Sequence, residues 1–237
     1  MDVIELSPRL HFLRFPVGHA YLWRDDDGLA LIDSGLPGSA QAIEEAVRTL
    51  GHHPADVRHL VLTHFHEDHV GGAAEVASWG DVTVHAHRAE APFILGQAAG
   101  PPPDLLDWER PLLERVRAGM PASAPVTPVR IDRELDDGDV LDFGGGARVL
   151  AVPGHTPGSI AVHLPEEGVL FTGDTVARTM SGEVILGVFN VDPARAVASL
   201  RRQAELDVEI ACFGHGEPLT RDASRQLKAA AARIPAV

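Results

Sequence analysis

The segment HFHEDH, residues 64–69, is the feature that most limits how this chain can fold. It follows residues 59–63 (HLVLT), a short apolar run typical of a strand buried on both faces. Positions 64, 66 and 69 would point in different directions on an α-helix, so the motif is predicted to be a loop. In a loop, its imidazoles and carboxylates can converge on one point, and both are ligands of borderline cations such as Zn²⁺. The sequence therefore predicts a metal site at the end of a buried strand.

Further His and Asp residues follow other predicted strands. His155 lies in PGHTPG between two strand-like runs, Asp174 lies in FTGDT, His215 lies in FGHG, and Asp33 lies in LIDSG. Taken singly, each His has an alternative role as a turn residue, and each Asp has an alternative role as a cap of backbone amides. Sites in α/β architectures are assembled at strand ends, so together these positions favour one shared site with residues 64–69.

The order of the predicted elements suggests two similar halves. Short β-like runs lead to a helix over 39–50, which Ser39 would cap, and later runs lead to helices over 193–204 and 222–233, capped by Asp192 and Asp222. This order predicts an α/β fold of two halves packed sheet against sheet, in a single domain over 1–237. Residues 96–128 interrupt it with Pro-rich connectors around one amphipathic piece at 105–116, and they are predicted to be an inserted segment.

Composition excludes several classes of protein. The chain has 34 Asp and Glu against 20 Lys and Arg, a net charge of −14, which disfavours nucleic acid as a partner. The single cysteine, Cys212, excludes an intrachain disulfide and is expected to be a small buried residue. Neither a secretory leader nor an apolar run of about 18 residues is visible, so we expect no membrane partner and a cytoplasmic location.

With these five motifs in this order, the chain resembles the metallo-β-lactamase fold superfamily of hydrolases over nearly its whole length. The resemblance implies a four-layer αββα sandwich with a dinuclear metal site at one edge of the two sheets. It also implies a role for each matching residue. One metal would be held by His64, His66 and His155, the other by Asp68, His69 and His215, with Asp174 bridging both and Asp33 orienting ligands through hydrogen bonds.

The implied activity is hydrolysis of a small ester, thioester or lactone. Two divalent cations, with zinc expected and iron or manganese as alternatives, would share a bridging hydroxide and polarise the substrate carbonyl. Asp68 would move a proton to the leaving group. Two other functions stay open: an oxidoreductase of the mononuclear iron persulfide-dioxygenase type, and a metal-binding scaffold without catalysis.

The motifs do not assign a subfamily. Asp174 stands where true β-lactamases of this fold usually carry Cys or Ser, and Ala177 stands where acyl-homoserine lactonases place a tyrosine. Glyoxalase II-like thioesterases share the metal motifs. The inserted segment, with Trp108 and Met120, is expected to form either a substrate lid or a contact with a second copy in a homodimer. His85 and His87 are expected to be polar rim groups, with a separate metal site as the weaker alternative.

Overall fold

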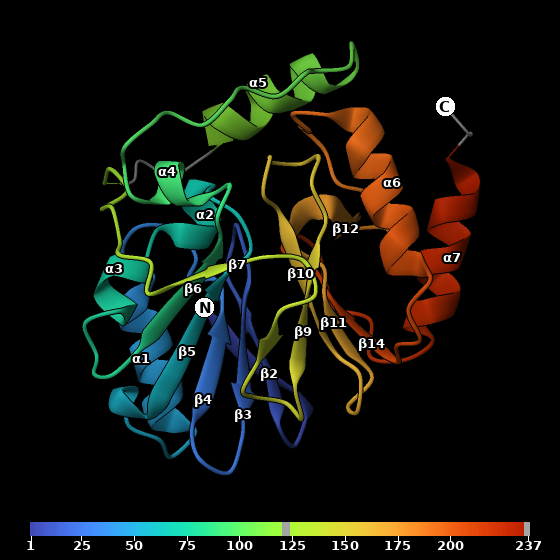
Figure 1. Ribbon diagram of the computed structural model, residues 1–237. Coiled ribbons are helices and arrows are strands. Elements are labelled where there is room, and N and C mark those ends of the chain that lie inside the picture. The colour runs from blue at the N-terminus through green and yellow to red at the C-terminus, as the bar shows by residue number, and fades with distance from the viewer. Residues whose placement is uncertain (120–123, 235–237) are drawn as a thin grey trace.

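Two β-sheets face each other, and helices cover the outer face of each, so the molecule is a four-layer αββα sandwich (Figure 1). The computed structural model describes residues 1–119 and 124–234, and Met120 lies outside them. Within that part of the chain, no helix is long and apolar enough to cross a membrane.

The first sheet has seven strands in sequential order. Its first four strands form an antiparallel meander, and the later ones pair in parallel. The strands are β1 (Asp2–Ser7), β2 (Leu10–Arg14), β3 (Ala20–Arg24), β4 (Leu29–Ile32), β5 (Val57–Leu62), β6 (Thr83–His87) and β7 (Arg133–Leu135).

The second sheet has five strands in the order β14-β11-β10-β9-β8. They are β8 (Val140–Leu141), β9 (Ala147–Ala151), β10 (Ile160–Leu164), β11 (Val169–Phe171) and β14 (Ile210–Cys212). A separate hairpin pairs β12 (Val176–Arg178) with β13 (Val184–Leu186).

Three apolar layers hold the sandwich together. One lies between the first sheet and the helices α1 (Ala40–Thr49) and α3 (Ala73–Val76), and one lies between the two sheets. The third lies under α6 (Pro193–Ala204) and α7 (Ala223–Arg233). The remaining helix is α5 (Glu109–Gly119), and the shorter helical turns are η1 (Pro54–Asp56), α2 (Glu67–Val70), α4 (Ala91–Ile94) and η2 (Gly173–Thr175). The apolar residues lie inside these layers. The polar residues described below lie at one edge of the sandwich, where several strands end.

The helix starts were predicted with mixed success. Asp192 caps α6 as expected, since its side chain accepts a hydrogen bond from the Arg195 backbone N–H at 3.0 Å. Ser39 and Asp222 precede their helices but make no side-chain cap bond, and Asp222 adopts a left-handed conformation with φ of 56°. A left-handed backbone directs the side chain away from the first turn, so the cap expected there does not form.

The prediction that all of residues 64–69 form a loop was wrong for its second half. The α2 turn begins at Glu67, so Asp68 and His69 lie on a short helix that follows the loop carrying His64 and His66. Glu67 and Asp68 lie in its first turn, where acidic side chains favour a helix start.

Candidate metal centre

Asp33 joins the ends of two neighbouring strands to α2. It follows β4, and its carboxylate accepts hydrogen bonds from the Thr63 backbone N–H and the Thr63 hydroxyl, each at 2.8 Å. The same carboxylate accepts a third bond from His69 Nδ1, also at 2.8 Å. Asp33 is buried and left-handed, with φ of 60°. The bond to Nδ1 sets the ring orientation of His69 and directs its Nε2 towards the neighbouring carboxylates.

The imidazole of His66 lies between two others. Its Nδ1 lies 3.0 Å from His64 Nε2 and 3.0 Å from His155 Nε2. Burial lowers the pKa of His64 and His155, and it lowers the pKa of His66 to about 3. The rings are therefore neutral at pH 7, and a proton on one nitrogen can satisfy only one of these two contacts. A cation shared by all three nitrogens satisfies the whole group.

A second group lies beside the first and carries charge. Asp68 Oδ2 lies 3.3 Å from His215 Nε2 and 3.8 Å from His69 Nε2. Burial by itself would lower the pKa of His215, but the carboxylates of Asp174 and Asp68 raise it to about 10. The pKa of His69 is raised in the same way, against burial, by Asp174, Asp68 and Asp33. This half of the centre therefore attracts positive charge.

Asp174 contacts both groups. Its Oδ2 lies 3.0 Å from His215 Nε2 and 3.7 Å from His155 Nε2, and its Oδ1 lies 3.3 Å from His69 Nε2. A Cβ at Gly214 would collide with this carboxylate and with the His69 ring, so only glycine fits there. Both Asp174 Oδ1 and His69 Nε2 are buried without a hydrogen-bond partner among the described residues. Unpaired polar atoms of this kind are costly unless a ligand satisfies them.

The structure therefore brings together all seven side chains that the sequence singled out as ligands. Three overlapping triads have ligand atoms within 4.8 Å of one another: His64, His66 and His155; His64, His69 and Asp174; Asp68, His69 and His215. Imidazole and carboxylate without sulfur suit zinc, iron or manganese. The orphaned buried atoms and this donor set fit a centre for divalent metal ions.

Glu90 is a buried residue of the site that the sequence did not reveal. It is 0% exposed, and its carboxylate accepts bonds from the backbone N–H of Phe65 at 2.8 Å, the hydroxyl of Thr156 at 2.9 Å and the backbone N–H of Gly158 at 2.6 Å. Burial raises the pKa of Glu90 to about 7, although all three donated bonds oppose this shift. Phe65 lies between two candidate ligands and Thr156 follows a third, so Glu90 holds the two histidine loops together.

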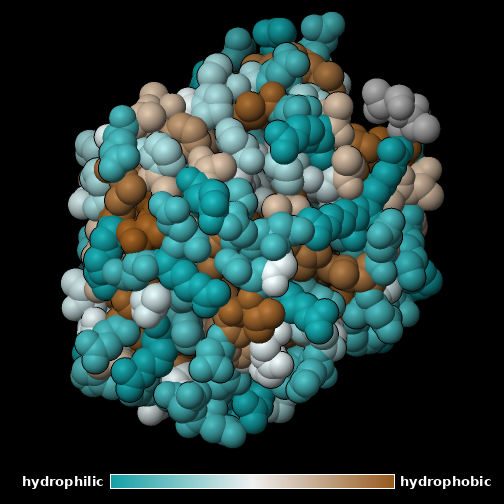
Figure 2. All heavy atoms as spheres, viewed as in Figure 1, coloured by the Kyte–Doolittle hydropathy of each residue, from teal (hydrophilic) through white to brown (hydrophobic). Residues whose placement is uncertain are grey.

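A cavity of about 650 Å³ opens beside these groups. The inserted segment forms part of its wall, because α5 lies across the site edge of the sandwich (Figure 1), and its Leu113, Val116 and Arg117 line the cavity. On the face shown in Figure 2, hydrophobic side chains appear among hydrophilic ones at this upper edge. The other lining residues include His66, Glu67, Asp68, Arg115, His155, Asp174, Ala177, Val188, Phe189, Val191 and His215.

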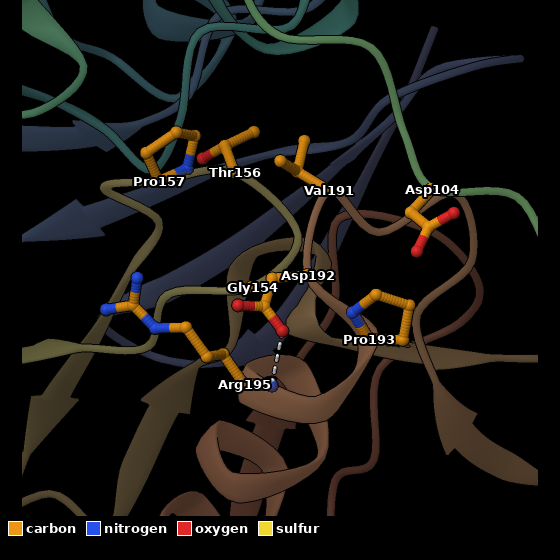
Figure 3. A pocket seen from close by; sticks show the side chains of 8 residues that line it. All are labelled: Asp104, Gly154, Thr156, Pro157, Val191, Asp192, Pro193 and Arg195. Carbon is orange, nitrogen blue, oxygen red and sulfur yellow. Dashed lines mark hydrogen bonds between the residues drawn. The ribbon is translucent and has the colours of Figure 1, made fainter.

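A smaller cavity of about 290 Å³ is lined by Gly154, Thr156 and Pro157, the neighbours of His155 in its loop (Figure 3). Val191 lines both cavities. The wall of the smaller cavity includes Gly154, where an added Cβ would collide with the backbone of Ala196 in α6. The side chain of Asp192 caps α6 in the same wall. This close packing fixes the loop that carries His155 against the start of α6.

His85 and His87 lie apart from this centre. His85 is buried, and its Nε2 lies 3.1 Å from His59 Nδ1, whereas His87 Nδ1 accepts a bond from the Ala89 backbone N–H. Within the described ranges, neither joins a triad of ligand-bearing side chains. Cys212 is buried as predicted, and burial raises the pKa of its thiol, so it is no nucleophile at neutral pH.

Two facing sheets with a His and Asp cluster at their shared edge define a metallo-hydrolase architecture. The sequence model of the metallo-beta-lactamase superfamily matches residues 13–215, and the chain belongs to that superfamily. It is therefore a metal-binding hydrolase of this fold, as the sequence predicted.

Relatives with known names support this assignment. A Bacillus subtilis (strain 168) protein named "Probable metallo-hydrolase YflN" is 29% identical, with 91% of this chain and 87% of that protein covered. A hydroxyacylglutathione hydrolase of Rhodobacter capsulatus is 29% identical over 83% of this chain, which spans only 61% of that enzyme. A crystal structure of a metallo-beta-lactamase family protein from Thermus thermophilus superposes with a TM-score of 0.71 at 27% identity, covering 96% of this chain and 80% of that one.

Proposed function

We propose that the chain hydrolyses a small ester, thioester or lactone with the help of two divalent metal ions, of which zinc fits the donor set best. The observation that carries this proposal is the position of Asp174. Its two oxygens face His69 at 3.3 Å and His215 at 3.0 Å, while His155 lies 3.7 Å away in the other group. One carboxylate placed between two ligand groups favours two bound ions over one.

We propose the same division of ligands that the resemblance implied. When bound, the ions supply a Lewis acid for the substrate carbonyl and make hydroxide available at neutral pH. The residues that would hold them are His64, His66 and His155 for one ion, and Asp68, His69 and His215 for the other, with Asp174 shared.

Asp68 is the proposed catalytic residue. It lines the large cavity, so its carboxylate reaches the space that a substrate would occupy. Burial would raise the pKa of Asp68, but the positive charges of His69 and His215 hold it well below its ordinary value. An ionised carboxylate there can orient the attacking water and pass its proton to the leaving group.

The substrate is proposed to be a small molecule enclosed by α5. Leu113 and Val116 face the cavity together with Phe189, Val188 and Val191, so much of its wall is apolar. Such a wall favours a substrate with a hydrocarbon portion beside its carbonyl group. This placement favours the lid over a contact between two copies. Nucleic acid is a poor candidate because the chain carries a net charge of −14.

Hydrolysis of a panel of para-nitrophenyl esters, thioesters and lactones by the metal-loaded protein tests this function. We expect turnover of at least one class, with two metal equivalents per chain and loss of turnover on chelation. One iron per chain with oxygen uptake on a persulfide would instead support the iron oxidoreductase. Substoichiometric metal without any turnover would support a scaffold.

A further inference from the structure

Helix α5 brings positive charge to the wall of the large cavity. Arg115 and Arg117 both line it, and Arg117 lies one turn after Leu113, on the same face of the helix. Neither guanidinium forms a hydrogen bond or ion pair with any residue of 1–119 or 124–234. Arg110 on the same helix differs: it lies 3.8 Å from the carboxylate of Asp107 and is absent from the described cavity wall.

The helix is anchored to the body of the protein at its first turn. Glu109 is only 2% exposed, and its carboxylate accepts bonds from the backbone N–H groups of Leu106 and Phe189, each at 2.9 Å. The Asp104 backbone N–H donates to the Asn190 carbonyl at 2.9 Å. Phe189 itself lines the cavity. The two arginines are therefore presented to the cavity by a helix whose start is fixed beside it.

Apart from the histidines, the other charged side chains in the described cavity wall are acidic, so Arg115 and Arg117 carry its positive charge. The acidic side chains in its wall are Glu67, Asp68 and Asp174, and the last two belong to the ligand triads. Two bound divalent ions and their shared hydroxide would balance the three carboxylates, so Arg115 and Arg117 remain as the excess charge. A substrate entering between the metal centre and α5 therefore meets net positive charge, in a protein whose overall charge is −14.

We infer that the substrate carries a carboxylate in addition to its scissile carbonyl, and that Arg117, assisted by Arg115, binds that carboxylate. This inference rests on the proposed hydrolase function. A guanidinium binds a carboxylate through paired charge-assisted hydrogen bonds. Leu113, Val116 and Phe189 would contact the hydrocarbon chain between the two ends of the substrate. The substrate class is thus the half-ester or half-thioester of a short dicarboxylic acid.

A matched pair of esters tests the inference. The mono-para-nitrophenyl ester of glutaric acid and para-nitrophenyl pentanoate share a leaving group and a chain length, and only the first carries a free carboxylate. With the metal-loaded protein, we expect kcat/KM to be about 10–100-fold higher for the glutarate ester, mainly through KM. The preference should weaken as ionic strength rises, because the attraction is partly screened.

Three variants locate the effect. Arg117→Gln should abolish most of the preference for the glutarate ester, Arg117→Lys should restore part of it, and Arg110→Gln should keep the wild-type preference. Calorimetric binding of free glutarate against pentanoate gives a readout that needs no turnover, and Arg117→Gln should weaken only glutarate binding.

The outcomes separate this inference from the proposed function. Equal kcat/KM for both esters in the wild-type protein, or an unchanged preference in Arg117→Gln, would overturn the carboxylate site while leaving the hydrolase intact. Equal binding of glutarate and pentanoate would likewise overturn the carboxylate site. The hydrolase function is overturned only if the metal-loaded protein turns over no ester, thioester or lactone of the panel.

Discussion

Asp33 Oδ2 lies 2.8 Å from His69 Nδ1, and both side chains are buried. The same carboxylate binds Thr63 at the end of β5, directly before His64. Asp33 therefore orients one candidate ligand and positions the start of the loop that carries two others, although its own carboxylate belongs to none of the triads.

Replacing Asp33 by Asn should weaken metal binding or activity by about 10–100-fold, since the amide cannot accept all of these bonds. Zinc affinity by competition with a chelator, together with kcat/KM, measures the effect. Ser34→Ala is the matched control, because the Ser34 hydroxyl donates only to the His69 carbonyl, at 2.8 Å, and not to its ring. Wild-type affinity and turnover in Asp33→Asn would refute the orienting role.

Asp174→Asn should reduce the metal content from two equivalents towards one. Asp174 Oδ1 and Oδ2 lie 3.3 and 3.0 Å from His69 Nε2 and His215 Nε2. In the asparagine variant one of these oxygens becomes an amide nitrogen, which can neither accept a hydrogen bond nor bind a cation. Elemental analysis after dialysis against limiting zinc is the measurement. Asp192→Asn, which alters an aspartate that caps α6, should retain full metal content. Two tightly bound equivalents in Asp174→Asn would contradict the shared carboxylate.

Glu90→Gln should loosen the two histidine loops. A glutamine side chain has a single carbonyl oxygen, so it cannot accept from Phe65 on one side and from Thr156 and Gly158 on the other. We expect zinc affinity to fall by about 10-fold. Glu109→Gln is the control: that carboxylate is also buried but binds Leu106 and Phe189, outside the metal loops, so zinc affinity should not change. Equal affinities in the two variants would reject the bracing role.

Buried His85, which contacts half-buried His59, should make the fold sensitive to acid. Burial lowers the pKa of His85 to about 3, below its ordinary value of 6.5. The unfolded chain therefore binds one more proton at this residue between these values. His85 alone should lower the free energy of unfolding by about 1.4 kcal/mol for each unit by which the pH falls through that window. Urea unfolding of the metal-free protein at several pH values measures this slope, and His85→Asn should flatten it. An identical slope in both proteins would be evidence against a contribution of His85 to the acid sensitivity.

The candidate ligands at strand ends could be predicted from sequence because they follow apolar runs closely, and parallel neighbours such as β11 and β14 end at the same edge of a sheet. Glu90 could not, since its partners lie 25, 66 and 68 residues away along the chain and no local pattern links them. The placement of α5 over the cavity could not be predicted from the sequence either. Its leucines predict an amphipathic helix, but the bond from Phe189 to Glu109 that anchors it joins residues 80 apart. Ser39 and Asp222 show the opposite case, in which suitable cap residues adopt a backbone that prevents the cap.

The most direct test of the account is one titration with two readouts. Protein stripped of metal by a chelator is loaded stepwise with zinc, while metal per chain and ester hydrolysis are followed together. We predict no turnover in the stripped protein, binding of two equivalents, and full recovery of turnover as the second site fills. Turnover that survives complete removal of metal, or two bound equivalents without turnover of any ester, thioester or lactone, would contradict it.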